Sequence, residues 1–193
     1  MDMLKTYADT LASRVSNTQA TDELGSVVSI DSAIQQLGKL GRQTHAAGNK
    51  IIFIGNGGSS AICSHMAIDY SKNGGMRALA FNDAAFLTCL GNDFGYDSVF
   101  TKQLEFHGRP GDLLVAISSS GQSSNILKAA TQAKAQGLTV VTLSGFKASN
   151  PLRLLGGLNF YLADDNYGFV ELGHLTLLHA ALDIAMGWRP DLT

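Results

Sequence analysis

Charged side chains are scarce in this chain of 193 residues, where they make up 16% of the sequence, against roughly 25% in an average soluble protein. The formal net charge is −2, so the chain lacks the basic surface that grips a phosphate backbone, and we expect no nucleic-acid partner. Proline is also rare, with 3 residues, while 45% of the residues are hydrophobic. This composition excludes a disordered chain.

Long hydrophobic segments are missing as well. No apolar run approaches the roughly 18 residues that span a bilayer, and residues 1–5 lack the basic start and apolar core of a secretory signal. We therefore expect a cytoplasmic protein with no membrane partner. Cys63 and Cys89 form neither a disulfide framework nor a zinc-finger spacing, and we predict two reduced, buried cysteines.

The pattern of apolar residues divides the chain into two segments of one domain. Residues 1–49 show helical spacing and predict two helices and no strand. Residues 50–193 alternate apolar runs of strand length with stretches of helix length. The predicted strands are 51–54, 78–81, 113–117, 139–143 and 158–162, and the predicted helices are 59–72, 84–90, 97–107, 123–136 and 169–186. This alternation predicts an α/β fold with a doubly wound, five-stranded parallel sheet.

Two polar loops follow predicted strands and lead directly into helices. The first, Gly55-Asn56-Gly57-Gly58-Ser59-Ser60, is rich in glycines that let backbone amides approach an anion, and the helix amino terminus adds partial positive charge. The second, Ser118-Ser119-Ser120-Gly121-Gln122-Ser123-Ser124, supplies hydroxyl and amide donors. Since neither loop contains Lys or Arg, we expect a phosphate monoester held by neutral donors, which favours sugar phosphates over nucleotides. The alternative for the first loop is a glycine turn needed only for geometry.

Ionisable residues recur on two of the predicted helices. His65 and Asp69 are four residues apart and share a helix face, which suits either a functional pair or a surface ion pair. On the last helix, Glu171 and His179 face broadly one way, whereas His174 is turned away and is expected to serve the structure. His65, Asp69, Glu171 and His179 are predicted to satisfy one another around a divalent metal or a bound sugar.

These motifs, taken in order, resemble a known family. They are Gly55-Asn56-Gly57-Gly58-Ser59 followed by His65, Gly91-Asn92-Asp93-Phe94-Gly95-Tyr96, Ile117-Ser118-Ser119-Ser120-Gly121-Gln122-Ser123, and Gly173-His174-Leu175 with His179. From about residue 33 to residue 184 the chain resembles the sugar isomerase (SIS) fold, and more narrowly the sedoheptulose 7-phosphate isomerases, also called phosphoheptose isomerases. The resemblance implies a flavodoxin-like sheet with N-terminal helices that contribute oligomer contacts.

The resemblance also implies an activity and a site. Family members interconvert sedoheptulose 7-phosphate and D-glycero-D-manno-heptose 7-phosphate through an enediol, as a step toward the heptose of lipopolysaccharide. They are cytoplasmic homotetramers with shared active sites, and some bind zinc. The predicted substrate-binding residues are Asn56, Gly57, Gly58, Ser59, Asp93, Ser118, Ser119, Ser120, Ser123 and Glu171. Asp69 and His179 match the catalytic positions, and the predicted zinc ligands are His65, Asp69, Glu171 and His179.

Three positions depart from the family pattern. Asp69 stands where the family has Glu, Glu171 where it has Gln, and Gly168 where some members have Asp. The shorter base at position 69 weakens the prediction of the substrate, whereas a second carboxylate favours a metal. Two alternatives are therefore kept, namely an isomerase or epimerase of another ketose phosphate and a non-enzymatic SIS regulator or adaptor that binds a protein.

Overall fold

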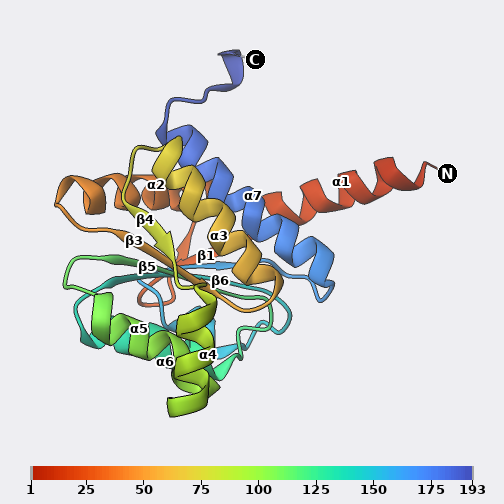
Figure 1. Ribbon diagram of the computed structural model, residues 1–193. Helices are drawn as coiled ribbons and strands as arrows, with labels where there is room; N and C mark the ends of the chain where they lie inside the picture. The colour runs from red at the N-terminus through yellow and green to blue at the C-terminus, as the bar shows by residue number, and fades with distance from the viewer. Residues whose placement is uncertain (1, 193) are drawn as a thin grey trace.

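A seven-stranded sheet runs through the centre of the molecule in the order β2-β1-β7-β6-β5-β3-β4 (Figure 1). The computed structural model describes residues 2–192, so Met1 and Thr193, at the outer ends of the two predicted segments, lie outside it. Five strands are parallel: β3 (Ile51–Gly55), β4 (Ala78–Ala80), β5 (Leu113–Ser118), β6 (Thr139–Ser144) and β7 (Leu158–Tyr161). The predicted α/β fold is thus confirmed, and the strand order reverses between β3 and β5, as in flavodoxin-like sheets.

The sheet has two more strands than predicted, and both belong to the N-terminal segment. Strand β1 (Gln19–Asp22) pairs antiparallel with β7 and with β2 (Val27–Val28). The prediction of two helices and no strand in this segment was therefore wrong. Strand β1, which lies between β7 and the short edge strand β2, buries fully only Ala20 and is otherwise polar, so its sequence lacks the apolar run that identifies the central strands.

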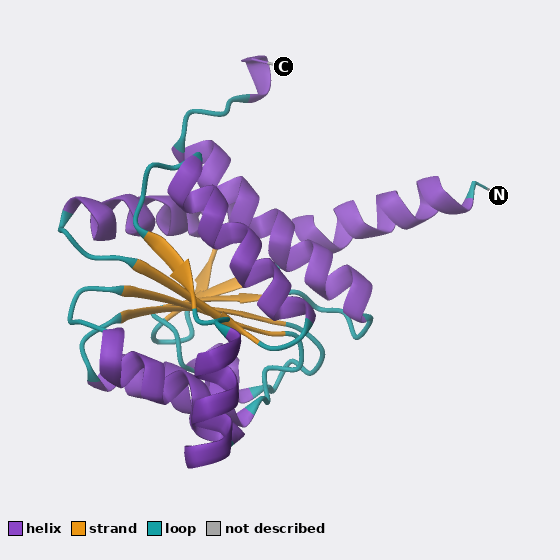
Figure 2. Ribbon diagram, viewed as in Figure 1, coloured by secondary structure: helices purple, strands orange, loops and turns teal. Residues whose placement is uncertain are grey.

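Helices cover both faces of the sheet (Figure 2). One face carries α2 (Ile30–Ala46), α3 (Gly58–Lys72) and α7 (Tyr167–Ala185), and the other carries α4 (Ala84–Phe94), α5 (Val99–His107) and α6 (Ser124–Ala135). Short 3-10 helices lie at Tyr96–Ser98, Pro151–Leu154 and Pro190–Leu192. Within residues 2–192, no helix combines the length and the hydropathy of a membrane-spanning segment.

The core lies in two layers because successive residues of a strand point to opposite faces. In β3, Ile51 and Phe53 pack toward α2, α3 and α7, whereas Ile52 and Ile54 pack toward α4, α5 and α6. Cys63 is buried in the first layer, but Cys89 is exposed on α4, so the prediction of two buried cysteines holds for only one of them.

The first helix, α1 (Met3–Ser16), projects from the body of the molecule and has no buried residue (Figure 1). Its side chains Met3 and Leu4 are 79% and 78% exposed. Apolar side chains left in water on a projecting helix are typical of a surface that a partner covers.

His174 on α7 is fully buried, and its Nε2 donates to the carbonyl oxygen of Ser144 at 3.1 Å. Burial lowers the pKa of this imidazole from 6.5 to about 4.

Between these values of pH the unfolded chain binds a proton at His174 that the folded chain does not, so the free energy of unfolding must fall as the pH falls through this window. The free energy of unfolding, measured by urea denaturation, should decrease by up to about 1.4 kcal/mol per pH unit from this group. His174→Gln should flatten that slope and His107→Gln, at an exposed site, should not; an equal slope in all three proteins would contradict this account.

Candidate active site

The two polar loops meet at the carboxyl ends of neighbouring strands. β3 and β5 pair in parallel, with Gly55 opposite Ile117, so both loops leave the same edge of the sheet. Between them lies a pocket of about 230 Å³. It is lined by Asn56, Gly57, Gly58, Ser59, Ile117, Ser118, Ser119, Ser120, Ser123, Tyr167 and Glu171. The structure thus brings together every predicted substrate-binding residue except Asp93.

Hydrogen-bond donors point into this pocket without strong partners of their own. Helix α3 begins after Gly57, whose φ of +55° favours glycine, and no side chain caps this helix end. The first amides of α3 are therefore free for an anion. In the serine loop, Ser118 Oγ lies 3.2 Å from Ser123 Oγ, and Ser119 Oγ is buried with no partner among the described residues. A buried, unpaired hydroxyl costs stability, and a bound phosphate oxygen would remove that cost.

The pocket has an unusual charge for an anion site. None of the described residues that line it is Lys, Arg or His, and its one ionisable carboxyl is that of Glu171. This carboxylate lies against Gly58, where a Cβ atom would collide with it. Glycine at position 58 therefore leaves room for this carboxylate, and a negative charge faces the amino terminus of α3.

Removing that charge should tighten phosphate binding. Glu171→Gln keeps the shape of the side chain but ends its repulsion of a phosphate dianion, so the Kd for inorganic phosphate should fall about 3- to 10-fold. Isothermal titration at low ionic strength measures this change. Glu23→Gln, on the exposed turn between β1 and β2, serves as the control with the same change in net charge. An unchanged or higher Kd in Glu171→Gln would show that the carboxylate does not oppose the anion.

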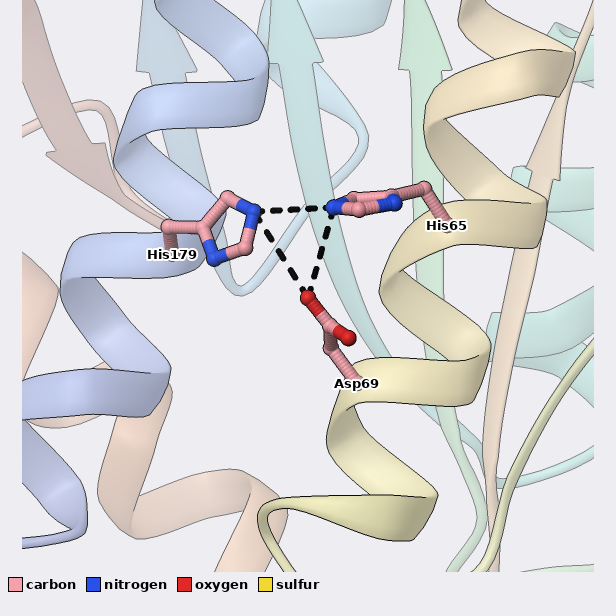
Figure 3. Close-up of side chains that lie close together, drawn as sticks. All are labelled: His65, Asp69 and His179. Atoms are coloured by element: carbon pink, nitrogen blue, oxygen red, sulfur yellow. Dashed lines mark hydrogen bonds and ion pairs between the residues drawn. The ribbon is translucent and has the colours of Figure 1, made fainter.

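A second group of residues lies on α3 and α7, which pack side by side. His65 and Asp69 on α3 face His179 on α7 (Figure 3). His65 Nε2 lies 3.1 Å from His179 Nε2, and Asp69 Oδ2 lies 3.3 Å and 3.7 Å from these two nitrogens. The side chains of His65, Asp69 and His179 are 51%, 17% and 35% exposed. Three groups able to exchange protons thus converge at a place that a small molecule can reach.

The same three atoms suit a divalent metal. A tetrahedral ion with bonds of about 2.0–2.1 Å holds its ligand atoms about 3.3 Å apart, which is close to the distances among His65, Asp69 and His179. The fourth predicted ligand, Glu171, does not belong to this group. It lines the pocket between the two polar loops, which is called the phosphate pocket below. The structure therefore supports a His-Asp-His metal site rather than the predicted four-residue set.

A hydrogen-bond network that the sequence did not predict joins Asn56 of the first polar loop to Asn125 and Tyr96. Asn56 and Asn125 exchange hydrogen bonds between their side-chain amides at 2.9 Å and 3.0 Å, and Tyr96 donates to Asn56 Oδ1 at 3.1 Å. This network fixes the orientation of the Asn56 amide. Asp93 lies outside the pocket on an exposed part of α4, where its carboxylate accepts from Asn92 Nδ2 at 2.8 Å.

A flavodoxin-like sheet, a cation-free anion pocket at its switch point and a His-Asp-His cluster farther along the same two helices define the class of sugar-phosphate isomerases. A family model described as "SIS domain" matches residues 10–145. A phosphoheptose isomerase of Yersinia pestis is 34% identical over 189 residues, covering 92% of this chain and 95% of its own. A phosphoheptose isomerase of Akkermansia muciniphila is 45% identical over 130 residues, covering 64% of this chain and 69% of its own. The structure of a phosphoheptose isomerase from Francisella tularensis matches with a TM-score of 0.81 and 25% identity, over 97% of this chain and 98% of that one.

The chain belongs to the SIS domain family and, within it, to the phosphoheptose isomerases. Its activity is accordingly an aldose–ketose isomerisation of a phosphosugar. The resemblance seen in the sequence is confirmed.

Proposed function

We propose that the protein converts sedoheptulose 7-phosphate to D-glycero-D-manno-heptose 7-phosphate. The observation that carries this proposal is the arrangement of the phosphate pocket and the His-Asp-His cluster on the same two helices. Gly58 at the start of α3 and Glu171 near the start of α7 line the pocket, and His65 and His179 follow seven and eight residues later. At 1.5 Å per residue, the cluster lies about 10–12 Å farther along these helices. This span suits a sugar whose reacting carbons are several bonds from its phosphate.

In the proposed mechanism, Asp69 is the base and His179 the acid. Asp69 removes a proton from the carbon next to the carbonyl, and His179 donates a proton to the carbonyl oxygen, which gives an enediol. Asp69 then returns a proton to the former carbonyl carbon, while His179 takes the proton from the other enediol hydroxyl, so that the ketose becomes an aldose and both groups regain their starting state. The roles fit the geometry because Asp69 Oδ2 and His179 Nε2 are 3.7 Å apart, so both groups reach adjacent atoms of one substrate.

Substrate binding is assigned to the ten predicted residues, with the serine loop and the start of α3 on the phosphate. Binding energy from the remote phosphate holds the reacting carbons at the base and the acid. Asn56, fixed by Asn125 and Tyr96, is suited to orient a sugar hydroxyl. Asp93 keeps its predicted role on the sugar, which would require it to approach from α4.

Zinc is the proposed cofactor, held by His65, Asp69 and His179. When bound, it would supply Lewis-acid polarisation of the carbonyl and of the neighbouring hydroxyl. The two imidazoles and one carboxylate suit zinc in ligand type and number and leave a coordination position open. Glu171 remains a predicted zinc ligand. Its carboxylate lies against Gly58 and would have to move toward the His-Asp-His cluster to bind the ion.

A cytoplasmic homotetramer with shared sites is the proposed assembly. Its support is the exposed apolar surface of α1, together with the exposure of the His-Asp-His cluster, which a neighbouring subunit would reduce. Light scattering should give the mass of four chains, and a clean monomer would count against shared sites.

Incubation of the zinc-loaded protein with a panel of ketose phosphates of five to seven carbons tests the function. The aldose product is followed by chromatography. We expect the seven-carbon sugar to give the highest kcat/KM. Faster turnover of a five- or six-carbon sugar would replace the proposed substrate, and binding without turnover of any sugar would favour a regulator or adaptor.

A further inference from the structure

A second cavity, separate from the phosphate pocket, runs along the edge strand β4 from the amino ends of β3, β4 and β5 to the residues that follow β4. Its lining includes Lys50, Arg77 and Asp112, which directly precede strands β3, β4 and β5. The two polar loops, in contrast, follow strands β3 and β5. The cavity measures about 560 Å³, against about 230 Å³ for the phosphate pocket. It is large enough for a ligand of the size of a cofactor, and the proposed isomerisation makes no use of it.

The cavity carries the positive charge that the phosphate pocket lacks. Lys50 is neutralised by the buried Asp112 at 2.5 Å, and Asp112 also accepts from the backbone of Lys50 and of Arg109. The guanidinium groups of Arg77 and Arg109 form no ion pair with any described residue, although Arg77 Nε donates to the carbonyl oxygen of Asn49 at 3.3 Å. The other acid in the lining, Asp83, accepts from the backbone amide of Phe86. Two guanidinium groups with free donors therefore remain, and such groups suit a phosphate.

Aromatic rings line the same cavity as these guanidinium groups. The ring of His107 is in contact with three phenylalanines, with centroids 6.3 Å from Phe81, 5.7 Å from Phe86 and 6.2 Å from Phe106. Phe86 and Phe106 are 38% and 57% exposed, and both line the cavity. Exposed rings at the wall of a cavity provide a surface on which a planar base can stack.

We propose that this cavity binds a nucleoside diphosphate. Its base stacks on Phe86 and Phe106, and its phosphates pair with Arg77 and Arg109. The two cavities then differ in the anion that they accept. The pocket of about 230 Å³, which has no cation in its lining, takes a phosphate monoester, and the cationic, aromatic cavity of about 560 Å³ takes a nucleoside diphosphate. This inference does not depend on the proposed substrate.

Isothermal titration of the full-length protein with ADP, adenosine and inorganic phosphate tests the proposal. ADP should bind at least about 10-fold more tightly than either fragment, because only ADP uses the rings and the guanidinium groups together. Absence of ADP binding would overturn the proposal. Because inorganic phosphate also binds at the pocket between the polar loops, its affinity for the cavity is measured as displacement of bound ADP. Displacement at concentrations equal to that of ADP would also overturn the proposal, since the cavity would then be a simple anion site.

Variants locate the binding. Arg77→Ala with Arg109→Ala should weaken ADP at least about 10-fold, and Phe86→Ala should weaken it several-fold. Arg42→Ala with Lys147→Ala removes the same charge elsewhere on the surface and should leave the Kd unchanged. Ser120→Ala, in the phosphate pocket, should also leave the ADP affinity unchanged.

Loss of ADP binding in Ser120→Ala, with retention in the double arginine variant, would place ADP in the phosphate pocket and contradict the proposal. A change of mass in the double arginine variant would instead mark the cavity as a contact between subunits and would likewise overturn it.

Discussion

Asp69→Asn should lower kcat by about 10²- to 10⁴-fold, which is the contribution of general acid–base catalysis by one group. The amide has the size of the carboxylate but cannot take up a proton at the pH of the assay. In deuterated water, the variant should also fail to exchange the proton next to the carbonyl of the ketose phosphate. Binding of the phosphosugar should persist, because the phosphate pocket lies at the start of α3, about 16 Å before Asp69 along the helix. Rapid-quench assays and mass spectrometry of the recovered substrate give both readouts.

Two further variants make this result specific. Asp69→Glu keeps a carboxylate on this face of α3 and should retain activity, whereas Asp9→Asn, at an exposed position of α1, should behave like the wild type. Full activity in Asp69→Asn would remove Asp69 from the role of base.

His179→Gln should lower kcat by about 10²- to 10³-fold and also reduce the zinc bound per chain. The glutamine cannot donate a proton as an imidazolium does, and it removes one of three convergent ligand atoms. Kinetics at saturating substrate, together with elemental analysis of the purified protein, separate these two effects.

His65→Gln helps to assign the cause. It should lose zinc to a similar extent but retain the acid, so at saturating zinc its kcat should recover more than that of His179→Gln. Equal kcat in His179→Gln and in the wild type would exclude His179 as the acid.

Much of this architecture could be predicted from the sequence because its signals are local. Every residue of β3 and of β5 is buried, so both strands appear as uninterrupted apolar runs. Their pairing then follows from the strand order, and it places the two loops together. The spacing of four between His65 and Asp69 also predicts their contact, which the structure gives as 3.3 Å.

Two predicted site residues, Glu171 and Asp93, lie apart from the His-Asp-His cluster, because helical periodicity does not report distance along the helix axis. Glu171 and His179 point in similar directions around α7, but eight residues separate them by about 12 Å along the helix axis, so they serve different parts of the site. The predicted helix 84–90 ends before Asp93. The helix α4 runs to Phe94 instead and places Asp93 on its side. Strand β1 was not predicted because its pairing with the distant strand β7, rather than its own composition, makes it a strand.

That pairing has a consequence for how the protein is made. Residues 19–22 leave the ribosome well before their partner strand, residues 158–161, is synthesised. Helix α7 follows later still and contributes Leu177 and Leu178 to the core as well as His179 to the cluster. A nascent chain therefore cannot complete its sheet before residues 158–161 have emerged, and such contacts between distant segments slow folding. Chains that terminate before α7 should expose one face of the sheet and become substrates for chaperones and proteases.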